Sequence, residues 1–439
     1  MWTEPLYTTE EMKRAEAGHD VTTLMDRAGR AVAEEVLSRF PDARSFGAVC
    51  GKGANGGDGR IALEVLRAAG RSAEEGLEGD VLLDALFGTG FNGVPRPEAA
   101  ELIERMNRHE GPVVAVDMPS GVDASSGEIP GTAVRAGLTV TFHAWKVGLA
   151  VAPGCFHAGQ IVAADIGLER HDTVNRLIGD DVLRLVPRKQ AEDTKYTAGS
   201  VLVVGGSPGL TGAACLTASA AFRADAGYVA VAAPRESLAV LEIRLLEAVK
   251  RPLEEVFEAA ERASALALGP GLGRDGGRKE LIRRLLEEVP LPAVVDADGL
   301  WELEPFERSA PTVLTPHAGE LGRLLGRESD WVDAHRLEAA RQAAHRYRCV
   351  VLLKGADTIV AESDNEGVLV YPGSAHGLAT AGSGDVLTGI IAAFLAKGLD
   401  ARTAAAAGVA AQERAAALAG KPAGLIAGDV VEALPLALA

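Results

Sequence analysis

A run of small residues separates one acid from the apolar helix expected to follow it. The stretch AGSGDVLTG, residues 381–389, places Gly382, Ser383 and Gly384 directly before Asp385. Glycine turns leave backbone N–H groups uncovered, and a helix N-terminus adds a positive end, so this stretch suits a phosphate group. Asp385 then has two interpretations: it caps the helix, or it takes a proton from a hydroxyl that attacks a phosphoryl group. The stretch alone does not choose between them.

Polar residues also gather where strands of the first half are expected to end. Asn55 and Asp58 lie in a loop after one strand, Asp84 and Asp117 close two others, and Ser120 follows the last. These oxygen groups suit a hard cation, or hydrogen bonds to ribose and amide groups. Turn chemistry explains any single loop, because Asp, Asn and Gly are the residues that sharp turns require. It explains the three loops together less well.

The same loop, CGKGANGGDG at 50–59, matches the dinucleotide pattern GxGxxG through Gly51, Gly53 and Gly56. That pattern needs an acid at the end of a second strand about 20 residues on. We expect Glu74, Glu75 and Glu78 to lie in a polar connector with no strand before them. The dinucleotide interpretation is therefore weak.

Short β-branched runs alternate with longer Ala-, Leu-, Glu- and Arg-rich segments, which predicts parallel sheets covered by helices. The polar, turn-rich stretch 186–199 is typical of a linker, so we expect an α/β protein with domains 1–187 and 188–439. Strands are expected at 46–50, 80–88, 112–121, 138–144, 160–167, 200–206, 228–234, 265–271, 292–299, 312–320, 349–362 and 367–373.

The composition and the net charge limit the kinds of partner that this protein could bind. The 439 residues carry a formal net charge of −17, which argues against nucleic acid and anionic membranes but not against a phosphorylated small molecule. Four dispersed cysteines without a CxxC pair, and an acidic N-terminus unlike a signal peptide, predict a cytoplasmic protein.

The first half resembles NAD(P)H-hydrate epimerase domains in LMDRAGRAV (24–32), GANGGDG (53–59), LLDALFGTGFNG (82–93), VDMPSGVDASSG (116–127) and TVTFHAWKVGLAVAPG (139–154). The resemblance implies a Rossmann-like three-layer α/β domain. It implies substrate contacts from Ala54, Asn55, Gly56, Gly57, Asp58, Gly88, Thr89, Gly90, Phe91, Asn92, Gly93, Val94 and Asp117, and a potassium ion held by Asn55, Asp84 and Ser120. Lys146 matches the family's strand-end lysine. About 20 residues separate Gly59 from Asp80, where the family has a further strand and helix, so this domain is expected to be shortened.

The second half resembles ribokinase-like kinases in AGSGDVLTG and in LLKGADTIV (352–360). The stretches GGSPGLTGAACLTASAAFRADAGYV (205–229), GPGLG (269–273), DADGL (296–300) and LTPHAGELGRLL (314–325) narrow the resemblance to ADP- or ATP-dependent NAD(P)H-hydrate dehydratase. The implied roles are nucleotide binding by Lys354, Gly355, Ala356, Asp357, Thr358 and Gly384, hydrate binding by Ala213, Gly273, His317 and Asp385, and catalysis by Asp385 as the base.

The whole chain is similar to bifunctional NAD(P)H-hydrate repair enzymes. Such enzymes imply hydrated NADH and NADPH as substrates, ADP or ATP with Mg²⁺ for dehydration, K⁺ for epimerisation, and assembly into a homo-oligomer. Two alternatives stay open at this point. The second half could phosphorylate a vitamin-precursor alcohol, and the first half could be a ligand-binding or assembly module without catalysis.

Overall fold

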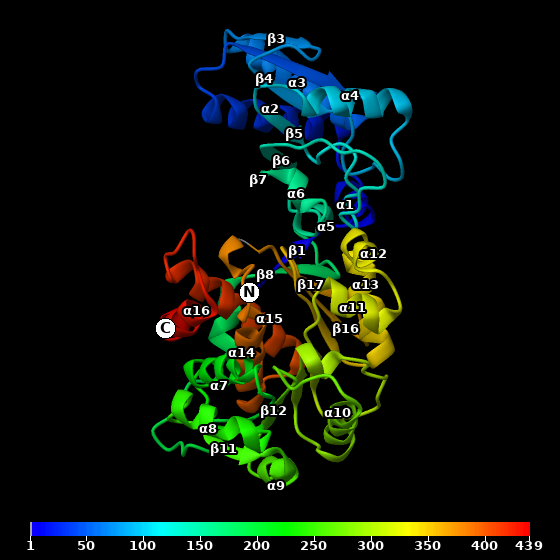
Figure 1. Ribbon diagram of the computed structural model, residues 1–439. Coiled ribbons are helices and arrows are strands. Elements are labelled where there is room, and N and C mark those ends of the chain that lie inside the picture. Colours follow the sequence, from blue (N-terminus) through cyan, green and yellow to red (C-terminus); the bar gives the residue numbers. More distant parts are fainter. Residues whose placement is uncertain (1, 374) are drawn as a thin grey trace. The chain divides into compact units, whose positions relative to one another are not determined.

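A computed structural model describes residues 2–373 and 375–439, which divide into two units (Figure 1). The N-terminal unit comprises Pro5–Arg176 with Asp333–His335. The C-terminal unit comprises Leu177–Val332 and Arg336–Ala439, with the first residues of the chain as far as Glu4. Each unit has its own sheet, parallel throughout in the N-terminal unit and mixed in the C-terminal unit, so the α/β class expected from the alternating pattern is confirmed.

The N-terminal unit has helices on both faces of its sheet, whose strands run in the order β3-β2-β4-β5-β6-β7 with all neighbours parallel. Val32 and Leu66 of α2 and α3 pack on one face with Leu83, whereas Ile103 of α4 packs on the other with Leu82. Successive strand residues point to opposite faces, which explains why Leu82 and Leu83 serve different layers. This is the expected three-layer, Rossmann-like arrangement.

The elements of this unit have the following bounds: α1 Thr9–Glu16, α2 Val21–Arg39, β2 Ser45–Cys50, α3 Ala54–Ala68, β3 Ser72–Glu75, β4 Val81–Ala85, α4 Pro97–Asn107, β5 Val113–Val116, β6 Leu138–Phe142, α5 Val147–Ala150, α6 Cys155–Ala158 and β7 Gln160–Ala164.

The edge strand β3 contradicts the expectation for the segment after α3. Glu74 and Glu75, predicted to lie in a connector, belong to β3, which pairs in parallel with β2. Glu78 follows this strand. The strand is short and only Ala73 in it is buried, because an edge strand needs few apolar side chains and carries little apolar signal. Glu75 pairs with Arg60 of α3 at 2.8 Å.

The C-terminal unit contains a sheet in the order β1-β8-β17-β16-β15-β14-β13-β12-β9-β10-β11. The strands from β15 to β11 are parallel neighbours, whereas β16 pairs antiparallel with both β15 and β17. The expected strand at 349–362 is thus two strands, β15 and β16, joined by a turn. The strands β1, β8 and β11 were not expected, and each is four residues long.

The elements associated with this sheet are β1 Thr3–Leu6, β8 Asn175–Ile178, β9 Ser200–Val204, α7 Thr211–Arg223, β10 Tyr228–Ala233, α8 Arg235–Arg244, β11 Val249–Pro252, α9 Val256–Ala260, β12 Ala265–Leu268, α10 Gly276–Glu288, β13 Ala293–Val295, β14 Thr312–Leu314, α11 Ala318–Leu325, α12 Ser329–Ala334, α13 Arg336–Tyr347, β15 Val350–Leu353, β16 Thr358–Glu362, β17 Asn365–Tyr371, α14 Ser383–Ala396, α15 Ala401–Leu418 and α16 Ala427–Ala437. Four 3₁₀ helices span Asp180–Leu185, Leu253–Glu255, Ala297–Leu300 and His376–Leu378.

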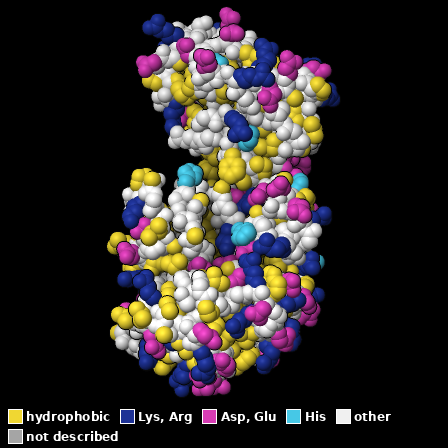
Figure 2. Space-filling model, viewed as in Figure 1, with side chains coloured by type: hydrophobic (Ala, Val, Ile, Leu, Met, Phe, Trp, Pro, Cys, Tyr) yellow, Lys and Arg dark blue, Asp and Glu magenta, His cyan; other side chains and the backbone are white. Residues whose placement is uncertain are grey.

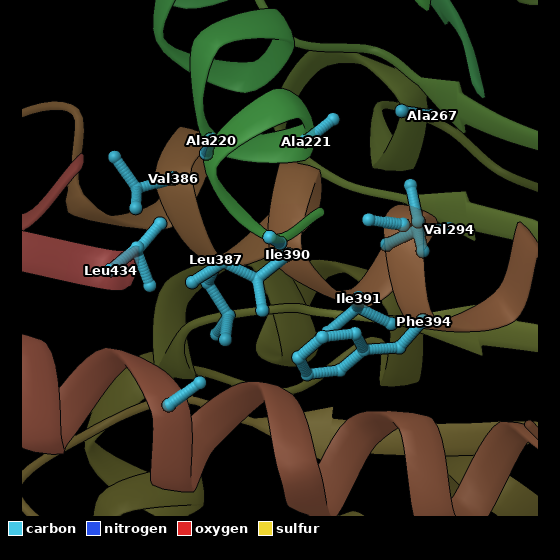
Figure 3. Packing of buried hydrophobic residues seen from close by; sticks show 14 of the residues in the cluster. Ala220, Ala221, Ala267, Val294, Val386, Leu387, Ile390, Ile391, Phe394 and Leu434 are labelled. Carbon is cyan, nitrogen blue, oxygen red and sulfur yellow. The ribbon is translucent and has the colours of Figure 1, made fainter. Parts of the chain in front are cut away.

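Helix α14 forms the centre of this unit's core. Every residue from Val386 to Leu395 is buried, and the helix packs against α7, α15 and α16. Figure 3 shows Leu387, Ile390 and Phe394 among side chains from α7 and the sheet. A helix that is apolar all round belongs inside a protein. The core therefore fixes the axis of α14, and with it the position of the glycine turn at its N-terminus.

The molecular surface mixes charges of both signs. On the face drawn in Figure 2, Lys and Arg side chains lie among Asp and Glu side chains rather than in one continuous basic area. Among the helices of residues 2–373 and 375–439, none combines the length and the apolar character that crossing a membrane requires.

The closest approach of α7 and α14 generates a stability prediction. A Cβ atom added at Gly389 would lie 2.2 Å from the carbonyl oxygen of Thr217. We expect Gly389→Ala to force the two helices apart and to lower the free energy of unfolding by about 1–3 kcal/mol, measured by urea denaturation.

Gly212, at the start of α7, is the matched control, because a Cβ there meets no atom within 4 Å. Gly212→Ala should leave the urea midpoint unchanged or slightly higher, since it only restricts the unfolded chain. Equal midpoints for the two variants would show that the helix contact does not limit stability.

Candidate active sites

Three adjacent parallel strands bring polar side chains to one edge of the C-terminal sheet. Asp296 directly follows β13, Lys354 directly follows β15, and His317 follows the intervening strand β14. An isolated bridge pairs His317 with Lys354. Ligands of open α/β sheets bind beyond the carboxyl ends of the strands, where these residues lie.

The glycine turn before α14 brings the N-terminus of that helix to the same edge. Gly382 is the N-cap with a φ of 90°, a left-handed conformation that glycine adopts without strain. A Cβ atom at Gly384 would lie 3.1 Å from Nζ of Lys354 and 3.5 Å from Oδ2 of Asp296. The glycines before Asp385 therefore allow the first turn of the helix to approach the strand ends closely.

Asp385 is half-buried on the first turn of α14, and its side chain is not the helix cap. Burial and the nearby charge of Asp296 raise its pKa to about 7, although the ammonium of Lys354 opposes both. A carboxyl group that titrates near neutral pH is suited to take and return a proton.

A cleft of about 660 Å³ lies against this helix start. Of the predicted residues, Lys354, Gly355, Ala356, Thr358, Gly384 and His317 line it. Asp385 is next in the chain to Gly384 but is not one of the lining residues. The cleft is also lined by Gly373, His376, Gln412 and Glu413, which the sequence did not single out because no recognisable motif contains them.

Asp357 is placed differently from the other predicted nucleotide contacts. Its side chain is 1% exposed, and its Oδ1 lies 2.6 Å from Nε of Arg336. Arg336 also donates from Nη2 to the carbonyl oxygens of Lys354 and Asp357, at 3.3 and 3.0 Å. The carboxylate of Asp357 therefore braces the turn between β15 and β16 from within, rather than facing the cleft.

His317 caps a helix and also lines the cleft. Its Nδ1 accepts hydrogen bonds from the backbone N–H groups of Gly319 and Glu320 and so caps α11. More than half of its side chain is exposed, and it lines the cleft. The capping interaction fixes the orientation in which the imidazole meets a ligand.

Thr217 links a predicted hydrate contact to the predicted base. Its hydroxyl lies 3.0 Å from the carbonyl oxygens of both Ala213 and Asp385. Gly273, on the loop after β12, donates its N–H to Oδ2 of Asp298 at 2.9 Å. A Cβ atom at Gly271 on this loop would lie 3.2 Å from Cβ of Ala213, so the two loops lie side by side.

In the N-terminal unit, the loop after β2 enters α3 without a side-chain cap. A Cβ atom at Gly56 would lie 2.0 Å from the carbonyl oxygen of Gly51, so the loop can close only with glycine there. Asn55 and Asp58 lie on one face of the helix, at i and i+3, and both are buried. Both amide atoms of Asn55 are buried without a hydrogen-bond partner among the described residues.

Asp84 and Ser120 meet at the ends of adjacent strands. Asp84 is fully buried and accepts hydrogen bonds from N–H and Oγ of Ser120, at 2.7 and 2.6 Å. Burial raises the pKa of Asp84 to about 6, although these hydrogen bonds pull it down. The side chain of Asn55 lies beside the loop that follows β4. A Cβ atom added at Gly88 of that loop would lie 3.0 Å from Cγ of Asn55.

Asp117 follows β5 and forms the charged centre of this unit. Its φ is 66°, a conformation that non-glycine residues adopt mostly where function or surrounding structure demands it. Its Oδ1 lies 2.7 Å from Nζ of Lys146, and its Oδ2 accepts hydrogen bonds from N–H and Oγ1 of Thr89. Burial would raise the pKa of Asp117, but Lys146 and Thr89 outweigh burial and hold it below its usual range.

Asp58 differs from Asp117, because its pKa is raised rather than lowered. Burial raises its pKa to about 8, and the charges of Asp117 and Glu16 push it the same way. The remaining predicted contacts are more exposed: Gly57, Gly88, Thr89 and Phe91 are half-buried, and Ala54, Gly90, Asn92, Gly93 and Val94 are exposed. The N-terminal unit thus holds a neutral and an ionised carboxyl group close enough to influence each other.

Comparisons with known proteins identify the family to which both halves of the chain are similar. A family model described as NAD(P)H-hydrate dehydratase matches residues 201–435, and one described as YjeF-related protein N-terminus matches residues 21–77 and 68–148. The bifunctional NAD(P)H-hydrate repair enzyme Nnr of Moorella thermoacetica is 36% identical over 94% of this chain and 92% of its own length. The Escherichia coli enzyme of the same name is 33% identical over 90% and 84%.

The chain belongs to the family of bifunctional NAD(P)H-hydrate repair enzymes. The ADP/ATP-dependent NAD(P)H-hydrate dehydratase of Bacillus subtilis, co-crystallised with ATP/Mg²⁺, is 28% identical with a TM-score of 0.54, over 59% of this chain and 95% of that one. A ribokinase-like superfamily protein from Enterococcus faecalis, 23% identical with a TM-score of 0.54 over 62% of this chain and 97% of that one, supports the ribokinase-like fold alone. Membership of the family favours a repair enzyme over the vitamin-alcohol kinase.

Sequence reasoning missed Asp296, Thr388 and Arg336 as parts of the dehydratase site. Asp296 lies inside the motif DADGL and Thr388 inside the motif AGSGDVLTG, but neither residue was predicted to have a role of its own. Their role depends on contacts across the fold: Asp296 accepts hydrogen bonds from Nζ of Lys354 and Oγ1 of Thr388. Arg336 begins α13 and carried no local signal.

The buried pair in the N-terminal unit yields a stability prediction. Lys146→Met leaves the carboxylate of Asp117 buried without its cation, and we expect the free energy of unfolding at pH 7 to fall by about 3–5 kcal/mol. Since the pKa of Asp117 is lowered in the folded state, its contribution is present above the unfolded pKa of about 3.9 and is lost as the pH falls below it. The loss should therefore shrink in acid.

The double variant Lys146→Met/Asp117→Asn is the control, because it removes both charges. Its denaturation midpoint at pH 7 should recover most of the loss. A double variant as unstable as Lys146→Met would show that packing of the lysine stem, rather than the ion pair, stabilises this edge of the sheet.

Proposed function

We propose that this enzyme repairs hydrated NADH and NADPH through two domains, residues 1–187 and 188–439. The N-terminal domain interconverts the R and S epimers of the hydrate. The C-terminal domain dehydrates the S epimer at the expense of ADP or ATP. The observation that carries the proposal is the carboxyl group of Asp385, with a pKa of about 7, on the first turn of the helix whose N-terminal residues Ser383 and Gly384 line a nucleotide-sized cleft.

Dehydration would begin at the ring hydroxyl of the hydrate. Asp385 takes the hydroxyl proton, and the oxygen forms a bond to the terminal phosphorus of the nucleotide while the bond to the bridging oxygen breaks. Backbone N–H groups at Gly384 and the ammonium of Lys354 stabilise the spread negative charge. The ring nitrogen then pushes out phosphate, a better leaving group than hydroxide, and loss of a ring proton restores the dihydronicotinamide.

We expect the nucleotide and the hydrate to contact different parts of this site. The turn from Lys354 to Thr358 and the N-terminus of α14 would hold the nucleotide, with Asp357 contributing through its backbone. Ala213, Gly273, His317 and Asp385 would contact the hydrate from the neighbouring loops. The link from Thr217 to both Ala213 and Asp385 supports this arrangement, because it joins the hydrate side to the base.

The carboxylates around Asp385 favour the binding of Mg²⁺ at this edge of the C-terminal sheet. The negative charges of Asp296, Asp298 and Glu320 all raise the pKa of Asp385, so an excess of carboxylates surrounds the base. A divalent cation on the nucleotide phosphates would offset that charge and polarise the transferring group. Glu320, which is buried on the first turn of α11, is the side chain we expect to hold it.

The base assignment predicts that Asp385→Asn abolishes dehydration while nucleotide binding persists. The measurement is recovery of dihydronicotinamide absorbance from the S epimer, with nucleotide binding followed by calorimetry. Because the pKa of Asp385 is raised in the folded state, its stabilising contribution is lost as the pH rises through about 7. The variant should therefore melt at least as high as the wild type at pH 8.

The same pKa predicts the pH dependence of the wild type. A base with a pKa of about 7 must be ionised to act, so kcat/KM for dehydration should rise about tenfold per pH unit below pH 7 and level off above it. Turnover near the wild-type rate in Asp385→Asn, or a profile flat from pH 5 to 8, would overturn the assignment.

For the N-terminal domain we propose that Asp117 contacts the hydrate and that Asn55, Asp84 and Ser120 surround K⁺. Three features support a weakly charged cation there: the orphaned amide oxygen of Asn55, the buried carboxyl of Asp84, and the hydroxyl of Ser120. Oxygen ligands of low total charge suit K⁺. The exposed loop from Gly88 to Val94 and the loop from Ala54 to Asp58 would cover the substrate.

Asp117→Ala is expected to slow exchange of the R and S epimers to near the spontaneous rate, without changing dehydration of the S epimer by the other domain. Chromatography of both epimers measures the exchange, and replacing K⁺ by Li⁺ should act in the same direction. The double variant Lys146→Met/Asp117→Asn, which keeps the fold without the buried charges, should be equally slow. Exchange at the wild-type rate in either variant would refute the role of Asp117.

We also propose that the enzyme works in the cytoplasm as a homo-oligomer with small-molecule substrates. Cys50, Cys215 and Cys349 are free, which suits a reducing compartment. On and just after α8, Ile243 and Leu246 are largely exposed, and Val240 is about half exposed. Assembly of copies of the chain would remove this apolar surface from water.

A further inference from the structure

Asp296 lies at the end of β13 and is 1% exposed. A carboxylate buried this deeply must be paired and hydrogen-bonded to offset the loss of hydration. Both of its oxygens have partners, and the partners belong to two different elements of the dehydratase site. The identity of those two partners indicates the role of the buried carboxylate.

One oxygen holds the end of a strand. Oδ1 of Asp296 lies 2.7 Å from Nζ of Lys354, which follows β15 two strands away in the sheet. About one fifth of the Lys354 side chain remains exposed, so it reaches the cleft while held from behind. Burial lowers the pKa of Lys354, but the charges of Asp296, Glu320 and Asp385 and the hydrogen bond to Asp296 together outweigh burial and raise it above its ordinary value.

The other oxygen holds the helix. Oδ2 of Asp296 accepts a hydrogen bond from Oγ1 of Thr388 at 2.8 Å, and Thr388 is fully buried on α14. Thr388 lies three residues after Asp385, on the same face of the first turns of α14. One carboxylate therefore joins the strand that carries Lys354 to the helix that carries Gly384 and Asp385.

Gly384 lies where the two tethers meet. A Cβ atom there would lie 3.1 Å from Nζ of Lys354 and 3.5 Å from Oδ2 of Asp296, so the anion-hole backbone approaches the ammonium directly. A phosphoryl group bound at this helix start would be within reach of both donors. Catalysis of phosphoryl transfer is mostly a matter of holding such donors in place.

We propose that Asp296 is a positioning residue of the dehydratase, which clamps Lys354 and Thr388 so that the ammonium and the anion-hole N–H groups meet the migrating phosphoryl group together. This inference rests on the proposed dehydration reaction. The clamp acts on the geometry of transfer rather than on contact with either substrate, so it should affect kcat more than the KM for the nucleotide.

Thr388→Val tests the clamp most directly, because it cuts the tether to the helix and leaves the Asp296–Lys354 pair intact. We expect kcat for dehydration of the S epimer to fall about tenfold or more, with the nucleotide KM within about threefold of wild type. Thr388→Ser keeps the hydroxyl and should restore kcat to within about threefold. Asp296→Asn, which weakens both tethers, should lower kcat about 100-fold.

Thermal melting of each variant separates loss of fold from loss of geometry, and Thr388→Val carries the test if Asp296→Asn does not fold. Wild-type kcat in a folded Thr388→Val variant, or a change confined to the nucleotide KM, would overturn the clamp. So would a Thr388→Ser variant as slow as Thr388→Val. If the wild-type enzyme itself fails to dehydrate the S epimer, the proposed function fails instead, which is a different result.

Discussion

A buried ammonium–carboxylate pair at the carboxyl edge of a parallel sheet underlies each of the two sites. Nζ of Lys146 lies 2.7 Å from Oδ1 of Asp117 in one unit, and Nζ of Lys354 lies 2.7 Å from Oδ1 of Asp296 in the other. Neither charge of such a pair can stay buried without its partner, since an isolated buried ion loses several kcal/mol of hydration. Each pair therefore holds two strand ends of its sheet at a fixed distance from each other.

The pairs also divide the acidic groups of each site into two kinds. Asp117 and Asp296 touch a lysine and have pKa values below the usual range despite their burial. Asp58 and Asp385 are buried near these ionised acids, and their pKa values rise to about 8 and about 7. One carboxylate kept ionised beside another kept near neutrality is a recurring arrangement for proton transfer. Two unrelated sheets have reached it by the same physical means.

Much of the fold could be predicted from the sequence, and the misses have a common cause. Strands such as β5 and β12 are continuous apolar runs, because central parallel strands are buried on both faces. The missed strands β1, β3, β8 and β11 are four residues long, and their stretches mix polar and apolar side chains. Their pairing comes from the strand beside them rather than from their own composition, so no pattern within them predicts it.

The sequence by itself determined the small-residue turns, the apolar helix after Asp385 and the order of motifs that identifies the family, because these are local properties of a few consecutive residues. Only the tertiary structure decided which charges meet. Asp296 and Lys354 are 58 positions apart, and Asp296 and Thr388 are 92 apart. It also turned the carboxylate of Asp357 inward to Arg336. The reason is that a carboxylate's role depends on its partners and its burial, which the chain acquires only when distant strand ends pack together.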